Sequence, residues 1–389
     1  MNLVRALHLF ANFKWTGPAD PAIRTAKGLR ELGADVVFAQ AQFMHGGEHW
    51  MSAALRRSRM PVTGDLQLPK HYGPLSALHD SRVLARRLRR GDFNVLHANL
   101  LTDHVSASLA NRLASGRAVL VRTIHEPESP LRNLRNRFAF GNTDGVVVPT
   151  QGCAETVAER FSLAPDRILI QEPTTDVHRF ERVRSDLREY WSLSDRHVVI
   201  GVTARIQPHR RFELLWEVAR EVVKEVPHAR FVLLGRGNEI DTRTLVHEPI
   251  ERLGLAKHVV LPGYLEEPDY TRALRSLDLF MFMVPGSDET CRAVREAMAA
   301  SLPVVTTRRG ILPELVGERT GGPAPGACGL IVEEETQAMC RAVVDLARDQ
   351  DRRRALGRAS RHRVMVLMGQ SAASRRLLDF YGVLRGLRG

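Results

Sequence analysis

The apolar residues of this chain fall into two alternating patterns. Short apolar runs bounded by Gly, Pro or charged residues are typical of buried strands. In the first half of the chain they occupy residues 4–10, 35–39, 94–98, 118–124 and 144–150. Segments with apolar residues three and four positions apart follow these runs and predict helices at 21–32, 76–90, 102–114 and 151–161. Alternating strands and helices predict a parallel sheet with helices on both faces, so we expect an α/β protein.

The second half of the chain repeats this pattern. Apolar runs predict further strands at 197–202, 231–237, 259–264, 279–284, 302–305 and 329–332, and a last helix is expected over 371–387. A length of 389 residues suits two domains, each burying its own core, with a junction near 181–195. Residues 40–72 are rich in Met, His and Gly and predict a long irregular loop, which is uncommon unless it is functional.

One stretch in the second half, residues 284–305, carries the strongest candidate chemistry. Pro285-Gly286-Ser287 ends a buried strand, a helix with an apolar face follows, and Leu302 opens the next strand. Asp288 and Glu296 lie at the two ends of the loop and helix, about 80° apart around a helix and about 12 Å apart along it. This separation suits two ends of an extended ligand better than one metal ion. The alternative is a capping acid and an ordinary surface Glu.

The same stretch resembles the retaining nucleotide-sugar glycosyltransferases of family 4. Their pattern is E-x7-E, in which the second Glu opens the word EAMA and a Gly and PVV follow. Glu296 matches the second Glu, and Asp288 stands at the first. Glu289, Cys291 and Ser301 stand where the family has glycines.

The resemblance implies the GT-B fold, in which two Rossmann-like doubly wound domains face each other across a cleft. It implies an acceptor-side domain over residues 1–182, a nucleotide-sugar-binding domain over 190–370, and a C-terminal helix over 371–389 that crosses back onto the first domain. The irregular segment 40–72 would help to shape the acceptor cleft. The implied activity is sugar transfer of the hexosyltransferase type, with retention of anomeric configuration.

Two cations are candidates for binding the donor diphosphate. Arg205 and Arg211 fit the spacing of the family word Gly-Arg-x5-Lys-Gly, with Arg211 in place of Lys and Phe212 in place of the second Gly. Both follow a predicted strand, where paired cations would bind a diphosphate and stabilise the charge that develops on it as a leaving group. The alternative is an exposed basic loop.

The resemblance assigns further positions to the site. In the first domain, Thr123-Ile124-His125 fits a T-x-H motif, so His125 would face the reacting sugar. Glu296 would hydrogen-bond the ribose and Asp288 a sugar hydroxyl. The positions expected to contact the donor are Gly17, Gly235, Gly237, Gly263, Glu289, Thr290, Cys291 and Glu296.

The implied mechanism requires no cofactor and no metal, because the departing phosphate takes the acceptor's proton and the nucleotide-diphospho-sugar is a substrate. Asp349-Gln350-Asp351 is the D-x-D of the sequence, and it lies in a polar helical run that reads as a solvated surface.

The net charge of +12 bears on the partners and the location. Its arginines form clusters that attract anions, at residues 82–90, 132–137 and 352–354. We expect a glycan or lipid-linked acceptor and a peripheral contact with an acidic membrane surface, although solvated helix faces would explain the charge equally well. Nucleic acid is disfavoured, because no recognition motif or aromatic platform accompanies the charge. The four cysteines are scattered, and the chain begins with a predicted strand in place of a signal peptide. Both features favour a cytoplasmic protein. If the protein binds a membrane, we expect it at the inner face of the cell membrane.

Two other functions stay open at this stage. An epimerase acting on nucleotide sugars could use the same fold and the same donor without an acceptor. The second is a non-catalytic protein that binds sugar nucleotides or nucleic acid. It stays open because four residues depart from the family pattern, namely Asp288, Glu289, Arg211 and Phe212.

Overall fold

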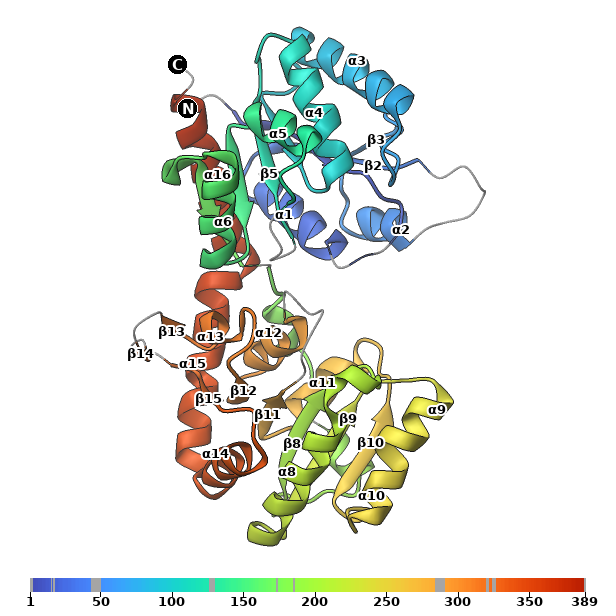
Figure 1. Ribbon diagram of the computed structural model, residues 1–389, viewed down its shortest axis with the longest axis vertical. Coiled ribbons are helices and arrows are strands. Elements are labelled where there is room, and N and C mark those ends of the chain that lie inside the picture. The colour runs from blue at the N-terminus through green and yellow to red at the C-terminus, as the bar shows by residue number, and fades with distance from the viewer. Residues whose placement is uncertain are drawn as a thin grey trace. The chain divides into compact units, whose positions relative to one another are not determined.

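The computed structural model describes residues 3–14, 16, 18–42, 50–125, 130–172, 174–184, 186–283, 291–319, 322–323 and 327–387. The chain forms two compact units (Figure 1). Unit 1 contains Met1–Thr174 and Leu367–Gly389, and unit 2 contains Thr175–Val366. Each unit has its own parallel sheet and its own core, as the α/β patterning predicts. The domain boundaries expected from the sequence stay predictions.

Unit 1 is built on a seven-stranded sheet in the order β3-β2-β1-β4-β5-β6-β7, in which every pairing is parallel. The strands are β1 (Arg5–Phe10), β2 (Asp35–Gln40), β3 (Val62–Thr63), β4 (Val95–Ala98), β5 (Val119–Thr123), β6 (Gly145–Val148) and β7 (Ile168–Ile170). The helices are α1 (Ala19–Glu31), α2 (Trp50–Arg57), α3 (Pro74–Arg90), α4 (Leu101–Leu113), α5 (Leu134–Gly141), α6 (Gln151–Phe161), the 3-10 helix Pro165–Arg167 and α16 (Gln370–Gly386).

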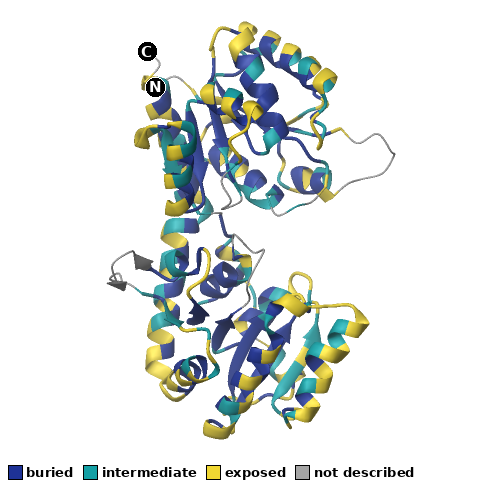
Figure 2. Cartoon of the chain, in the orientation of Figure 1, coloured by how far each residue is buried: buried dark blue, intermediate teal, exposed yellow. Residues whose placement is uncertain are grey.

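Helices cover both faces of this sheet, which explains why its strands carry apolar side chains on both faces. Within β1, Ala6 and Phe10 pack into one core and Leu7 and Leu9 into the other. Buried residues accordingly fill the sheet and its helix contacts, while the outer helix faces are exposed (Figure 2).

The C-terminal helix α16 packs beside α1 on one face of this sheet. Gly28 permits the close approach, because a Cβ at that position would lie 2.1 Å from Oγ of Ser374. The predicted return of the last helix to the first domain is therefore confirmed.

The prediction of a wholly irregular segment at 40–72 is wrong, because the segment contains α2 and β3. Met51, Ala54 and Leu55 form a buried helical stripe in α2. The Met, His and Gly content of the segment concealed this short amphipathic pattern.

Unit 2 contains a six-stranded sheet in the order β10-β9-β8-β11-β12-β15, again with parallel pairings. Its strands are β8 (Val198–Thr203), β9 (Ala229–Leu234), β10 (Val259–Gly263), β11 (Leu279–Phe282), β12 (Val304–Thr307) and β15 (Gly329–Val332), and β13 (Glu318–Arg319) pairs antiparallel with β14 (Gly322–Pro323). The helices are α7 (Leu187–Tyr190), α8 (Phe212–Glu225), α9 (Glu239–Thr242), α10 (Glu248–Arg252), α11 (Asp269–Arg275), α12 (Arg292–Ala299), α13 (Leu312–Leu315), α14 (Thr336–Arg348) and α15 (Gln350–Met368), with 3-10 helices at His178–Phe180 and Pro208–Arg210 and a π-helix at Arg243–His247.

The strand order of unit 2 reverses at β8, from which β9 and β10 follow in one direction while β11, β12 and β15 lie in the other. In open parallel sheets, ligands bind at the carboxyl ends of the strands beside such a reversal. The loop that follows β8 is therefore a candidate ligand site. Among the residues that the structure describes, no helix is both long enough and apolar enough to span a bilayer.

Candidate functional site

The loop after β8 carries both predicted diphosphate cations. It runs from the end of β8 through a 3-10 turn at Pro208–Arg210 to the start of α8. Arg211 caps α8 in the left-handed conformation, with φ 55° and ψ 39°. Phe212, which stands where the family has Gly, is buried and packs near Trp216 in the core of unit 2. The helix start is thereby fixed, and Arg211 remains partly exposed.

The carboxyl ends of two neighbouring strands, β9 and β10, hold this segment in place. The backbone N–H of Ala204 donates to the carbonyl of Leu234 at 3.1 Å, and that of Gly235 donates to the carbonyl of Gly263 at 3.0 Å. A Cβ on Gly235 would lie 1.8 Å from the Ala204 oxygen. Gly237 is also constrained, although less severely, since a Cβ at that position would lie 2.7 Å from Ile206. These glycines allow the backbone of the Arg205 loop to approach, which no side chain would permit.

The two cations differ in their partners. Arg205 is exposed and makes no ion pair with any described residue. Arg211 donates from Nε to Oε1 of Glu213 at 2.9 Å and from Nη1 to Oε1 of Glu334. Nε of Arg309, which follows β12, donates to the other oxygen of Glu334. One guanidinium is therefore open to solvent and the other is engaged by carboxylates.

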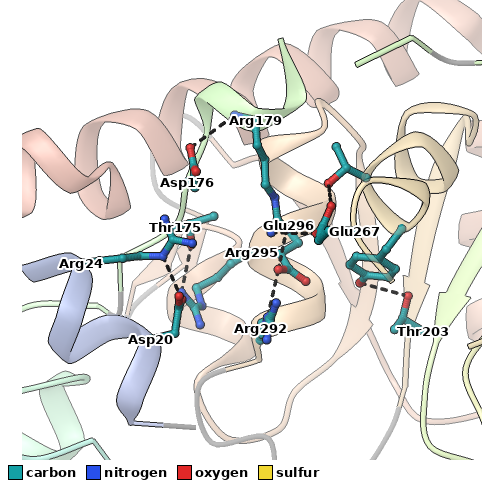
Figure 3. A network of polar contacts seen from close by, with 12 residues as sticks. Asp20, Arg24, Thr175, Asp176, Arg179, Thr203, Glu267, Arg292, Arg295 and Glu296 are labelled. Atoms are coloured by element: carbon teal, nitrogen blue, oxygen red, sulfur yellow. Dashed lines mark hydrogen bonds and ion pairs between the residues drawn. The ribbon is translucent and has the colours of Figure 1, made fainter. Parts of the chain in front are cut away.

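Glu296 lies on α12 in a buried charged network (Figure 3). Its Oε1 accepts hydrogen bonds from Nη2 of Arg179 at 2.5 Å and from Nε of Arg292 at 2.9 Å. Arg179 also pairs through Nη1 with Glu267 at 3.0 Å. Burial alone would raise the pKa of Glu296, but the charges of Arg292 and Arg179 outweigh it and lower that pKa. Glu296 is therefore an anion at neutral pH.

Tyr270 connects this network with the end of β8. Its hydroxyl lies 3.5 Å from Oγ1 of Thr203, the last residue of β8. Burial, and after it the charge of Glu296, raises the pKa of Tyr270, so the phenol stays protonated. The Glu296 network thus borders the β8 end of the sheet.

In unit 1, His125 lies just beyond the carboxyl end of β5 and lines a small pocket with His97, Asn99, Thr123 and Gln171. Its Nε2 lies 3.2 Å from Oδ1 of Asn99. Burial, with a smaller effect of the Arg122 charge, lowers the pKa of His125 to about 3. His125 is neutral at physiological pH and too weakly basic to accept a proton readily, so hydrogen bonding is the role open to it.

Both ring nitrogens of His97 have hydrogen-bond partners within unit 1. Its Nδ1 lies 2.5 Å from the hydroxyl of Tyr381 on α16, and its Nε2 lies 2.6 Å from Oγ1 of Thr123. Its ring stacks on His8, with ring centroids 4.4 Å apart. Both ring nitrogens are engaged, which favours a structural role.

Two family models match this chain, one over each half. The model described as Glycosyltransferase Family 4 matches residues 17–179, and the model described as Glycosyl transferases group 1 matches residues 197–349. The chain belongs to glycosyltransferase family 4. The fold is GT-B-like, and the protein is a retaining glycosyltransferase that depends on a nucleotide sugar.

Individual relatives of this family 4 glycosyltransferase are distant in sequence. The putative glycosyltransferase YtcC of Bacillus subtilis (strain 168) is 22% identical over 340 residues, which is 82% of this chain and 81% of YtcC. A D-inositol 3-phosphate glycosyltransferase of Segniliparus rotundus is 24% identical over 295 residues, which is 74% of this chain and 64% of the relative. The crystal structure of Anabaena Alr3699/HepE in complex with UDP has a TM-score of 0.75 at 18% identity, over 97% of this chain and 100% of that chain.

Four of the residues expected in the site of this family 4 glycosyltransferase lie outside the described residues, namely Gly17, Asp288, Glu289 and Thr290. Cys291 is described. It is buried, and it caps α12 in the left-handed conformation at φ 40° and ψ 52°.

The structure brings Arg205, Gly235, Gly237 and Gly263 onto adjoining loops at the carboxyl edge of the unit 2 sheet. His125 belongs to unit 1. Their roles in the reaction remain predictions.

Several charged residues around these positions escaped the sequence analysis. They are Arg179, Glu267, Arg292, Arg309 and Glu334. Arg179 lies just before the expected domain junction at 181–195, but its partner Glu296 is distant in the sequence. Spacing along the chain gives no signal for such a pair.

Proposed function

We propose that this glycosyltransferase transfers a sugar from a nucleotide-diphospho-sugar to a lipid-linked or polysaccharide glycan intermediate. Unit 2 binds the donor, and unit 1 serves the acceptor side. The observation that carries the donor assignment is the loop after β8, where Arg205 is exposed and Arg211 caps α8. Guanidinium groups at the carboxyl edge of a parallel sheet suit a diphosphate in both charge and hydrogen-bond geometry.

In the proposed reaction, the bond between the anomeric carbon and the diphosphate oxygen breaks while the acceptor oxygen bonds to that carbon on the same face. The acceptor's proton passes to the departing phosphate oxygen. Arg205 and Arg211 stabilise the charge that develops on the diphosphate. Glu296 hydrogen-bonds the ribose, and Asp288 a sugar hydroxyl.

The pocket around His125 supports a contact with a sugar. Neutral hydrogen-bonding groups line much of it, including His125, Asn99 and Thr123. The buried Oε1 of Gln171 has no hydrogen-bond partner among the described residues, so it is available to a hydroxyl donor. His125 would hydrogen-bond the sugar without exchanging a proton, in agreement with its low pKa.

An exposed surface of unit 1 supports the peripheral membrane contact. Leu75, Leu131 and Leu134 are 85%, 73% and 83% exposed. The guanidinium of Arg135 lies 4.9 Å from the ring centroid of Tyr72, and this contact joins the chain before α3 to the first turn of α5. Exposed apolar side chains among arginines suit an anionic lipid interface. The proposed location is the cytoplasmic face of a membrane.

Two measurements test this function. The first is the thermal stability of the protein with a panel of UDP-, GDP- and dTDP-sugars, since a ligand that binds the folded state raises its stability. We expect one nucleotide to stand out. The second is incubation of that donor with and without lipid-linked glycan acceptors. Acceptor-dependent transfer supports the proposal, whereas an epimerised donor formed without acceptor favours the epimerase.

Vesicle sedimentation tests the membrane contact separately. Leu131→Ser with Leu134→Ser should reduce binding to vesicles that contain anionic lipid. The matched control is Val383→Ser, at a residue 53% exposed on α16. Equal binding by the two variants would contradict the assignment of this surface.

A further inference from the structure

Three charged side chains meet at the carboxyl edge of the unit 2 sheet. Arg211 follows β8, Arg309 lies two residues after the end of β12, and Glu334 lies two residues after the end of β15. Oε1 of Glu334 accepts from Nη1 of Arg211, and Oε2 accepts from Nε of Arg309. A single carboxylate therefore bridges two guanidinium groups from different loops.

The accessibility of these groups is unequal. The side chain of Glu334 is 17% exposed, whereas those of Arg211 and Arg309 are 37% and 41% exposed. The bridging carboxylate is thus more enclosed than the two cations, which solvent and solutes can reach.

The geometry suits a doubly charged anion. Because each donor nitrogen lies at hydrogen-bond distance from the same carboxylate, the two nitrogens are within about 8 Å of each other. A diphosphate also presents anionic oxygens in pairs, and guanidinium forks bind such oxygens well. Arg309 stands close enough to Arg211 to contact the same diphosphate.

We propose, resting on the donor site described above, that Arg309 is a third guanidinium of the diphosphate site. Glu334 is its resident anion: it occupies Arg211 and Arg309 in the free enzyme, and the donor diphosphate displaces it. Neither residue was singled out by the family motifs.

The exchange follows from electrostatics. A diphosphate cannot bind between Arg211 and Arg309 while the Glu334 carboxylate remains there, because like charges repel at this range. Exchanging one anion for the other leaves neither guanidinium without a partner in either state. Competition by Glu334 lowers the apparent affinity for the diphosphate, in proportion to the fraction of molecules in which the cations are engaged.

Glu213 provides a matched comparison. It pairs with Nε of the same Arg211 at 2.9 Å, but it is 61% exposed and forms no ion pair with Arg309. Glu213→Gln and Glu334→Gln remove the same charge beside the same arginine. Only Glu334→Gln removes the bridge between Arg211 and Arg309. A difference in pyrophosphate affinity between the two variants therefore distinguishes displacement of Glu334 from a general effect of the lost negative charge.

The test is isothermal titration of the full chain with inorganic pyrophosphate. We expect Glu334→Gln to bind pyrophosphate about tenfold more tightly than the wild type, and Glu213→Gln to differ from it by less than about twofold. Arg309→Gln should weaken binding about tenfold. Unchanged or weaker affinity in Glu334→Gln, or an equal gain in both glutamine variants, would overturn the displacement.

Arg309→Gln keeps the inference testable if Glu334→Gln does not fold, because unchanged affinity in Arg309→Gln would overturn it alone. A nucleotide sugar that stabilises the wild type, combined with pyrophosphate affinities unaffected by these variants, would refute this inference and leave the proposed function standing. A wild type that binds neither pyrophosphate nor any nucleotide sugar would refute both.

Discussion

Arg179 Nη2 lies 2.5 Å from Oε1 of Glu296, and 117 positions of sequence separate the two residues. Arg179 follows the segment that enters unit 2, whereas Glu296 belongs to α12. The side chains are 18% and 7% exposed, so solvent screens the pair only weakly. Glu296, the residue expected to hydrogen-bond the ribose, is thus held as an oriented anion by Arg292 within its own motif and by Arg179 from outside it.

Removing Arg179 should destabilise unit 2. Arg179→Met removes one of the two guanidinium groups that pair with Glu296 and leaves Arg292, and we expect a loss of about 2 kcal/mol in the free energy of unfolding. Urea denaturation measures it. Arg272→Met is the control, because the pair of Arg272 with Asp186 is on the surface and should contribute much less. Equal losses in the two variants would contradict the importance of the buried pair.

Gly235 should not tolerate a side chain. A Cβ there would lie 1.8 Å from the Ala204 oxygen, so Gly235→Ala must push the Arg205 loop away from β9. We expect a loss of about 2 kcal/mol in stability together with weaker donor binding. Gly382→Ala, on α16 with no atom within 4 Å of the added Cβ, should be neutral or slightly stabilising. A Gly235→Ala protein as stable as the wild type would show that this loop is not tightly packed.

Acid should destabilise unit 1 through its buried histidines. Burial lowers the pKa of His8 and His125 to about 3, and those of His97 and His104 well below 6.5. Unfolded imidazoles titrate near 6.5, so below that pH the unfolded chain binds more protons than the folded one. Asp103 acts oppositely: burial raises its pKa to about 7, so its contribution to stability is present at low pH and lost as the pH rises through 7.

The four histidines outweigh Asp103 together with Asp80, whose pKa burial also raises. The free energy of unfolding should therefore fall as the pH drops from about 6.5 towards 5, by about 2–4 kcal/mol per pH unit. Denaturation at a series of pH values measures this slope. A free energy that is constant or rises on acidification would contradict the assignment of neutral buried imidazoles.

Much of the fold could be predicted because its signals are local. Apolar runs such as residues 35–39 and 118–124 coincide with β2 and β5 to within one or two residues, since a strand buried on both faces needs continuous apolar side chains. The segment that contains α2 was misread because three buried residues among many Met, His and Gly residues make a weak pattern.

The candidate site was predictable only where a motif is contiguous. Arg205 and Arg211 lie on one loop, and their spacing makes them candidates for the diphosphate site. Glu334 meets Arg211 from a loop 123 positions further along the chain, and no local pattern encodes that contact. Such pairings depend on the order of strands in the sheet, which brings distant loops to one edge.

The central claim is that the loop after β8 binds the donor diphosphate through Arg205. The most direct test is isothermal titration of Arg205→Ala with the nucleotide sugar that stabilises the wild type, beside Arg196→Ala, an exposed arginine just before β8 at the opposite end of that strand. We predict that Arg205→Ala weakens binding by at least about tenfold at an unchanged melting temperature, whereas Arg196→Ala binds as the wild type does. Equal affinities in the two variants would contradict the account.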